Sequence, residues 1–306
     1  MNTWKRYIVA RTIDEAIQAL GAADGPACPV AGGTDLLLEL QQGHHPPVDT
    51  LVDISSIPEL TCLEIRSGAL FIGAGVPVGQ LAESPLVCEH AQAVAEACGL
   101  IGGPQVRNTA TLGGNVAHAL PAADGMIALV AMDAQVEIAS PEGRRFAPIL
   151  SLFRGPGQST LIPDREILTG FYLPLRKQGQ ASAFSRVMRP QGVALPILNI
   201  AVWLARQGGS IAAIRIAVGP AGPTPQRALA VEEMLKGAAF CQETVEQAKS
   251  IWRKTMRFRT SPHRATAEYR DHLSGILFEK VLHTAWQRAG QPDEALTALQ
   301  FTGEVG

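Results

Sequence analysis

Hydrophobic residues along the first sixty positions fall in short runs that helical stretches separate. Three of these runs are typical of strands and lie at 7–10, 27–31 and 50–54. Between the first two, the capping-box pair Thr12 and Glu15 precedes apolar residues at helical spacing, and Gly21 follows them. A leucine-rich stretch at 36–40 predicts a short helix that ends at Gly43. This alternating strand–helix order predicts a small parallel sheet.

From about residue 60 the pattern changes to paired strands and helices of small residues. Apolar runs at 61–65 and 69–73 flank a polar turn and predict a hairpin. Further elements are expected as helices at 91–99 and near 125–133, and as strands at 135–140 and 166–174. These elements predict a second, mixed α+β unit, and the polar stretch at 175–181 reads as the linker that ends it.

A third unit begins with two long apolar strands. They lie at 197–205 and 211–218 around Gly208-Gly209, which predicts an antiparallel hairpin, and helices follow. In the longest helix, five residues at helical spacing fall on one face, which is expected to pack in the core. They are Tyr269, Leu273, Ile276, Leu277 and Val281. The chain is therefore expected to divide into domains at 1–58, 59–177 and 178–290, with a tail at 291–306.

Composition excludes several classes of protein. The 306 residues are 46% hydrophobic and 18% charged with a net charge of −2, as is ordinary for a soluble enzyme. No dense run of lysine and arginine is present, which argues against nucleic acid as a partner. The N-terminus has no apolar signal region, and no apolar stretch reaches the roughly 18 residues of a membrane span. A cytoplasmic protein with no membrane span is expected.

Cysteines and histidines offer no ligand pattern. The five cysteines are odd in number and never form C-x-x-C, so neither disulfides nor a zinc or iron–sulfur site is expected in this chain. The seven histidines include no H-E-x-x-H pair and are expected to be structural. A G-x-S-x-G elbow and a Walker A lysine are also absent, so serine hydrolysis and ATP hydrolysis have no support.

Two pairs of adjacent glycines carry the strongest chemical signal. Gly32-Gly33 lies in PVAGGTDLL at 29–37, and Gly113-Gly114 lies in NTATLGGNVAHALPAAD at 108–124. Such pairs suit a backbone at positive φ or a close approach to a ligand, and consecutive N–H groups in such a turn bind anions. Two turns from two differently built units suit a pyrophosphate, although each alone reads as an ordinary tight turn. Side chains of the same segments are expected to help, Thr34 and Asp35 as caps of the first helix, Thr111 and Asn115 as hydrogen-bonding groups and Asp124 as a carboxylate.

A third glycine-rich stretch, FIGAGVPVG at 71–79, resembles a dinucleotide fingerprint only loosely. Its glycines are spaced G-x-G-x-x-x-G, Pro77 interrupts the expected start of a helix, and no parallel βαβ unit is predicted to follow. We interpret it as unrelated to nucleotide binding.

Four segments together resemble one family, the FAD-binding medium subunits of molybdenum hydroxylases, which include carbon monoxide dehydrogenase and xanthine dehydrogenase flavoproteins. They are AGGTDLL at 31–37, IGGPQVRNTATLGGNVAHALPAAD at 101–124, EILTGFYLP at 166–174 and AGPTPQRALAVEEMLKG at 221–237. The resemblance covers almost the whole chain. It implies an α+β fold of two FAD-binding subdomains, of the vanillyl-alcohol-oxidase/PCMH type, followed by a C-terminal α+β domain with an antiparallel sheet.

The same resemblance implies roles for particular residues. The first loop that cradles the FAD pyrophosphate comprises Pro29, Val30, Ala31, Gly32, Gly33, Thr34, Asp35 and Leu36. The second comprises Thr111, Leu112, Gly113, Gly114 and Asn115. Asp124 is expected on the adenosine side, against the alternative that it caps a helix beginning near Gly125, and Ile101 and Leu168 are expected against the isoalloxazine. Arg186 stands where the family commonly has a lysine, and an arginine does not reproduce a lysine's geometry.

The family also implies partners. A large subunit is expected to carry the molybdenum cofactor and a small subunit two 2Fe-2S clusters, in a dimer of heterotrimers. This chain's FAD is expected to collect electrons for an external acceptor. Two alternatives remain open from the sequence: a self-sufficient FAD-dependent oxidase of the same fold, and an assembly subunit that has lost FAD. The substrate and the acceptor are not encoded in these motifs.

Overall fold

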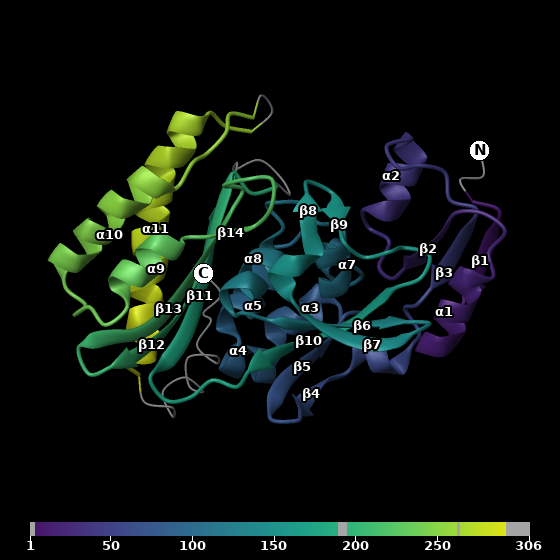
Figure 1. The fold of residues 1–306 in the computed structure, drawn as a ribbon, viewed down its shortest axis with the longest axis horizontal. Helices are drawn as coiled ribbons and strands as arrows, with labels where there is room; N and C mark the ends of the chain where they lie inside the picture. The colour runs from purple at the N-terminus through teal and green to yellow at the C-terminus, as the bar shows by residue number, and fades with distance from the viewer. Residues whose placement is uncertain (1–3, 189–194, 262–263, 292–306) are drawn as a thin grey trace.

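The computed structural model describes residues 4–188, 195–261 and 264–291 (Figure 1). Strands and helices are mixed throughout, so the predicted α+β class is confirmed. Figure 1 shows the chain passing from a small sheet at the N-terminal end, through a central sheet covered by helices, to a four-stranded sheet backed by three helices. Within the described residues no helix combines the length and the apolar character needed to cross a membrane.

The N-terminal sheet is parallel, as predicted, with strand order β1-β3-β2. Its elements are β1 (Arg6–Val9), α1 (Ile13–Gly21), β2 (Ala27–Val30), α2 (Leu36–Gln42) and β3 (Thr50–Asp53). The Thr12 hydroxyl accepts the N–H of Glu15 at 3.1 Å, which begins α1 where the capping pair predicted it. Gly43 ends α2 at φ 71°, a left-handed conformation that favours glycine.

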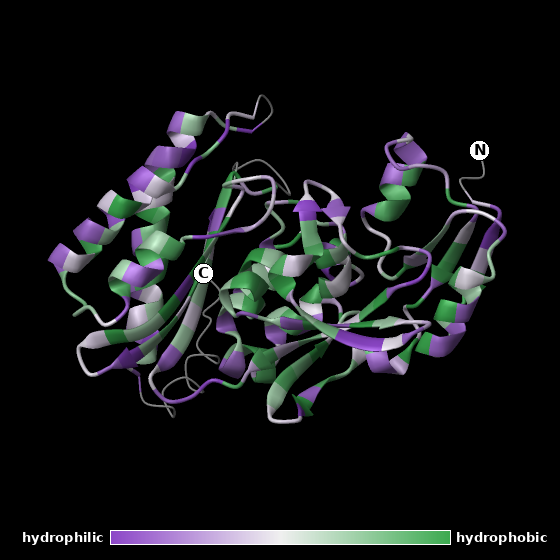
Figure 2. Cartoon of the chain, viewed as in Figure 1, coloured by the Kyte–Doolittle hydropathy of each residue, from purple (hydrophilic) through white to green (hydrophobic). Residues whose placement is uncertain are grey.

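The central sheet is antiparallel with strand order β4-β5-β10-β6-β7. Its strands are β4 (Leu63–Arg66), β5 (Ala69–Gly73), β6 (Gln135–Ser140), β7 (Gly143–Pro148) and β10 (Ile167–Pro174). The helices are α3 (Val78–Glu83), α4 (Pro85–His90), α5 (Gln92–Gly99), α6 (Pro104–Arg107), α7 (Leu112–Ala117) and α8 (Asp124–Ala131). The short connecting elements are η1 (Pro58–Thr61), η2 (Ile149–Leu152), β8 (Phe153–Gly155) and β9 (Gln158–Ser159). Every residue of α8 is buried, and Figure 2 shows this helix as predominantly hydrophobic.

The C-terminal sheet has the order β11-β12-β13-β14, and its pairs are antiparallel, as predicted. Its elements are β11 (Gln180–Val187), β12 (Leu198–Gln207), β13 (Ser210–Gly219), β14 (Gln226–Arg227), α9 (Leu229–Leu235), α10 (Gln242–Thr255) and α11 (Ala267–Ala289). The three helices cover one face of the sheet, while α5 and α8 contact the other (Figure 1). β11 begins inside the predicted linker, at Gln180. The domain limits at 58, 177 and 290 stay a prediction, and the tail from 292 lies outside the described residues.

The predicted core face of α11 is partly wrong. Tyr269 is 49% exposed and Ile276 is 57% exposed, whereas Leu277 and Val281 are buried. The helix instead buries a face that includes the neighbouring Phe278, and this face packs on β11 and β12. Because the helix packs on the sheet, its buried face is displaced by about one residue from the predicted face.

The stretch at 71–79 does not form the parallel βαβ turn of a dinucleotide fingerprint. Both neighbours of β5 are antiparallel, so no parallel βαβ unit exists there. A Cβ on Gly73 would lie 2.3 Å from the Leu60 carbonyl oxygen, which shows that this glycine permits close packing on η1. Contrary to expectation, Pro77 does not prevent a helix, because α3 starts at Val78 with Pro77 as its N-cap.

Candidate functional site

The first glycine-rich loop connects the end of β2 to the start of α2. Pro29 and Val30 are strand residues, paired with Val52 and Asp53, so the connection proper runs from Ala31 to Asp35. Gly33 has φ 65°, where a side chain is strained. The loop leaves the carboxyl edge of a parallel sheet, where open α/β sheets bind their ligands.

Backbone N–H groups of this loop are available to a ligand. In the part of the chain that the structure describes, the N–H groups of Gly32, Gly33, Thr34 and Asp35 donate to no protein acceptor. Asp35 stands at the N-cap position of α2, but its side chain makes no cap hydrogen bond, so its predicted capping role is wrong. Four consecutive unbonded amides form the kind of donor set that binds phosphate oxygens.

The second glycine-rich loop does not offer the free amides that were expected of both glycine pairs. The Gly113 N–H donates to the Ala74 carbonyl at 2.8 Å, and the Gly114 N–H donates to the Thr111 hydroxyl at 3.0 Å. The Asn115 amide oxygen accepts the N–H of Met126 at 3.2 Å. Neither Gly113 nor Gly114 has a positive φ, so that part of the prediction is wrong. The amides of this loop hold the start of α7 and are not free donors.

Space explains the second pair of glycines. A Cβ on Gly113 would lie 2.5 Å from the Ala74 carbonyl oxygen, so glycine is required there for packing. A Cβ on Gly114 would lie 3.1 Å from the Thr111 hydroxyl and, in the part of the chain that the structure describes, would otherwise enter open space. Gly114 therefore offers bare backbone to a close-lying ligand, while Gly113 serves the fold.

The fold brings the two loops into direct contact. A Cβ on Gly32 would lie 2.1 Å from the carbonyl oxygen of Thr109, two residues before the second loop begins. Farther along, His118 Nε2 lies 2.9 Å from a carboxylate oxygen of Glu39 on α2. The unbonded amides of the first loop and the bare backbone at Gly114 thus belong to one region.

Asp124 is the first residue of α8 and lies at the contact with the C-terminal sheet. It is 4% exposed, forms an ion pair with Arg186 and accepts a hydrogen bond from Asn199 Nδ2 at 2.7 Å. The alternative that its carboxylate caps the helix is wrong, because the carboxylate bonds these two side chains. Burial raises the pKa of Asp124 and the Arg186 charge opposes that rise. Arg186, which stands where the family commonly has a lysine, therefore directs its positive charge at the Asp124 carboxylate.

Two polar atoms beside Asp124 have no hydrogen-bond partner among the residues that the structure describes. They are Arg186 Nε and Asn199 Oδ1, and both are buried. Buried polar atoms are nearly always bonded, so a donor and an acceptor left free at one place fit a polar ligand group. A ribose hydroxyl or an adenine amine has this chemistry. Asn199 was missed from the sequence, although a single asparagine in the apolar run ILNIAVWLA was a visible signal.

The two predicted isoalloxazine contacts lie in the central domain. Leu168 is 6% exposed and stands in β10 next to a bulge, while Ile101 is half-buried in the turn after α5. Arg107 fixes that turn by donating to the Gly102 carbonyl at 2.8 Å. Both apolar side chains pack on the same large core cluster, and their contact with a flavin stays a prediction.

An ionic contact joins the central and C-terminal domains. Glu96 on α5 accepts the N–H of Phe184 at 2.7 Å and a hydrogen bond from Arg288 Nη2 at 2.5 Å. Ser182 accepts the N–H of Ala93 at 3.0 Å. These bonds fix the edge strand β11, which carries Arg186, against α5. Nothing in the sequence pattern marked them.

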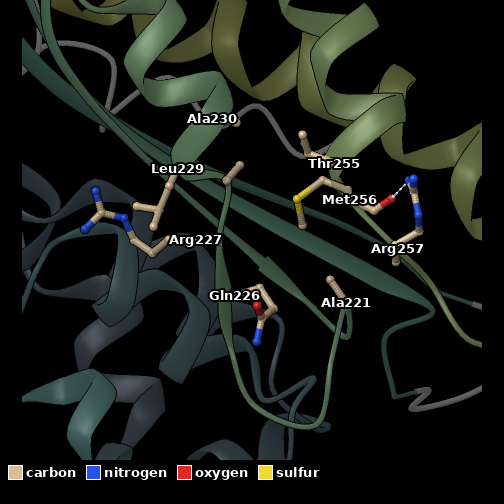
Figure 3. A pocket seen from close by; sticks show the side chains of 9 residues that line it. Ala221, Gln226, Arg227, Leu229, Ala230, Thr255, Met256 and Arg257 are labelled. Carbon is tan, nitrogen blue, oxygen red and sulfur yellow. Dashed lines mark hydrogen bonds between the residues drawn. The ribbon is translucent and has the colours of Figure 1, made fainter.

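A separate cavity of about 300 Å³ lies in the C-terminal domain, between β14 and the ends of α9 and α10 (Figure 3). Its lining includes Leu229, Met256 and Arg257, and Arg227 at its edge is paired with Glu232. None of the predicted site residues lines it.

Fold and geometry together define a class. The chain combines a parallel sheet, a helix-covered antiparallel sheet and a second antiparallel sheet, and the first two meet at glycine-rich loops, one of which has unbonded amides. Unbonded amides of this kind are typical of proteins that bind a phosphate-containing ligand.

Comparison with known proteins identifies the family. Residues 2–176 match the family described as "FAD binding domain in molybdopterin dehydrogenase", and residues 182–285 match "CO dehydrogenase flavoprotein C-terminal domain". The chain therefore belongs to the FAD-binding subunits of molybdenum hydroxylases and is an oxidoreductase subunit.

Similar proteins span nearly the whole chain. The putative xanthine dehydrogenase FAD-binding subunit XdhB of Escherichia coli K12 is 34% identical over 293 residues, which are 95% of this chain and 99% of that one. The carbon monoxide dehydrogenase medium chain of Hydrogenophaga pseudoflava is 30% identical, over 92% and 97% of the two chains. A solved carbon monoxide dehydrogenase from that organism, which lacks the Mo-pyranopterin moiety of its molybdenum cofactor, matches with a TM-score of 0.87 at 30% identity, covering 93% and 98%.

Proposed function

We propose that this chain is the FAD-carrying electron-transfer subunit of a molybdenum hydroxylase, receiving electrons from a partner's 2Fe-2S clusters and passing them to an external acceptor. The observation that carries the proposal is the contact between the two glycine-rich loops, with four unbonded amides on one and bare backbone at Gly114 on the other. Membership of the FAD-binding family supports the choice of FAD over other dinucleotides.

Each part of the site has a distinct task in this proposal. The segment from Ala31 to Leu36 donates its amides to the pyrophosphate, and Gly114 lets the ligand approach the second loop. Asp124, with Arg186 and Asn199, holds polar groups on the adenosine side. Arg186 Nε and Asn199 Oδ1, which have no partner among the described residues, are proposed to bond the adenosine half of FAD. The remaining assigned residues, Pro29 and Val30 in β2 and Thr111, Leu112, Gly113 and Asn115 at α7, support the loops.

Ile101 and Leu168 are proposed to exclude water from the isoalloxazine. Bound FAD supplies the chemistry, because it can exchange electrons both singly and in pairs. The protein's own contribution is binding and orientation, and no general acid or base in this chain is required.

The relatives support a multi-subunit assembly. Carbon monoxide dehydrogenase and nicotine 6-hydroxylase relatives are named as medium chains or subunits, which implies larger and smaller partners. For this chain we propose a large molybdenum-cofactor subunit and a small 2Fe-2S subunit, assembled as a dimer of heterotrimers. Five free cysteines are compatible with the reducing cytoplasm, which we propose as its compartment.

The test is purification of the native complex followed by a visible spectrum and metal analysis. Flavin, iron and molybdenum that co-purify in constant ratio with this chain support the proposal. Flavin alone, with substrate-dependent reduction in the isolated chain, would establish the self-sufficient oxidase instead. Absence of flavin from a correctly assembled complex would leave the assembly-subunit alternative.

A further inference from the structure

His118 lies at a contact between the two proposed FAD-binding subdomains. It directly follows α7, the helix that begins with the second glycine-rich loop. Its Nε2 lies 2.9 Å from Glu39 Oε1, and its Nδ1 lies 3.8 Å from Asp35 Oδ2. Because a carboxylate accepts only, Nε2 carries the proton in this contact. One side chain thus links the second loop's helix to the helix that follows the first loop.

The helix that His118 contacts is lightly anchored. α2 has seven residues, of which Leu40 alone is buried, and Leu38 is 50% exposed. A short helix of this kind has little stability of its own and depends on tertiary contacts. Since the first loop ends where α2 begins, a shift of α2 moves the unbonded amides of Gly33 and Thr34. The contact with His118 is therefore placed to fix these amides.

The contact also orients a carboxylate beside the first loop. The His118 Nε2 N–H donates to the Glu39 carboxylate and holds it on the side of α7. The other ring nitrogen, Nδ1, lies 3.8 Å from Asp35 Oδ2, which is beyond hydrogen-bond distance. The link between the two helices is therefore the His118–Glu39 hydrogen bond.

We propose that His118 is a positioning residue for FAD binding, which acts through Glu39 to hold the first glycine-rich loop against the second. The inference rests on the proposed function, because it concerns the same site. Close backbone packing of Gly32 on Thr109 holds the two loops together at one end. The His118–Glu39 hydrogen bond holds them together at the other end.

The experiment titrates the purified, FAD-depleted chain with FAD and follows flavin fluorescence, with thermal melting of each FAD-free variant. His118→Leu is expected to weaken FAD binding about tenfold, the low end for a charge-assisted hydrogen bond that is partly exposed. His118→Gln keeps an N–H donor and is expected to restore affinity to within about threefold of wild type. Glu39→Leu should match His118→Leu, and the double variant should be no weaker than either single one.

A matched control is His45→Leu. His45 follows the same helix, but its ring bonds the carbonyl of the adjacent Pro46, at 2.7 Å, and no other group of the described residues, so FAD affinity should not change. Unchanged affinity in His118→Leu, additive losses in the double variant, or an equal loss in His118→Gln and His118→Leu would each overturn the inference. Wild-type protein that binds no FAD would overturn the proposed function together with it, so the two failures are distinguishable.

Discussion

Replacing Gly114 with alanine adds one methyl group to a part of the second loop that faces open space. Among the described residues, and apart from the backbone of its own helix, that methyl would lie within 4 Å of the Thr111 hydroxyl alone, at 3.1 Å. Gly114 lies inside α7, where alanine is favoured over glycine by about 0.5–1 kcal/mol. The apoprotein is therefore expected to be as stable as wild type or slightly more stable.

The affinity for FAD, in contrast, should fall in Gly114→Ala. If FAD packs against the Gly114 backbone, the methyl group overfills that contact, at a cost of about 1–3 kcal/mol. Affinity should then fall about 5- to 150-fold. The assay is FAD titration of the apoprotein combined with urea unfolding of the same sample without FAD.

Gly113→Ala is the matched comparison, because it is the neighbouring glycine. Its methyl would lie 2.5 Å from the Ala74 carbonyl oxygen and 2.6 Å from the Ala74 Cβ. This variant should lose folding stability, by about 1–3 kcal/mol. Wild-type FAD affinity in Gly114→Ala, or the same loss of folding stability in both variants, would refute the reasoning.

Three further experiments test other parts of the account. Asp124→Ala leaves its buried guanidinium partner without an opposite charge and should destabilise even the apoprotein by about 3–5 kcal/mol in urea unfolding, whereas an unchanged midpoint would contradict the buried pair. A double-mutant cycle of Glu96→Gln and Arg288→Gln should give a coupling energy of at least about 0.5 kcal/mol in the same assay, and strict additivity would argue against their contact. Leu277→Ala should cost about 2–5 kcal/mol and Ile276→Ala less than about 0.5 kcal/mol, and the reverse order would mean that the exposed face of α11 is misassigned.

Elements with strong local signals were predictable from the sequence. The parallel sheet followed from apolar runs alternating with a capped helix, and the hairpins followed from glycine-containing turns such as the one at Gly208, where φ is 59°. The exposed stripe of α11 was not predictable. Tyr269 and Ile276 share the spacing of core residues, and only the packing of the helix on β11 and β12 decides which face is buried.

The candidate site was predictable as a set of segments but not as a set of contacts. The sequence placed the first glycine pair correctly before a helix, but it did not predict α7 at the second pair, and it assigned both pairs the same task. The structure separates them, because the first loop leaves its amides unbonded while Gly113 and Gly114 use theirs within the protein. The pairing of Asp124 with Arg186, 62 positions later, depends on how two sheets dock, which no local pattern records.

The most direct test of the central claim is a comparison of FAD and FMN as ligands of the purified chain. The account predicts one FAD bound per chain, and FMN bound at least about 100-fold more weakly, because FMN lacks the second phosphate and the adenosine that the loops and the Asp124 group would hold. Equal affinity for FMN and FAD, or no binding of FAD by the folded chain, would contradict it.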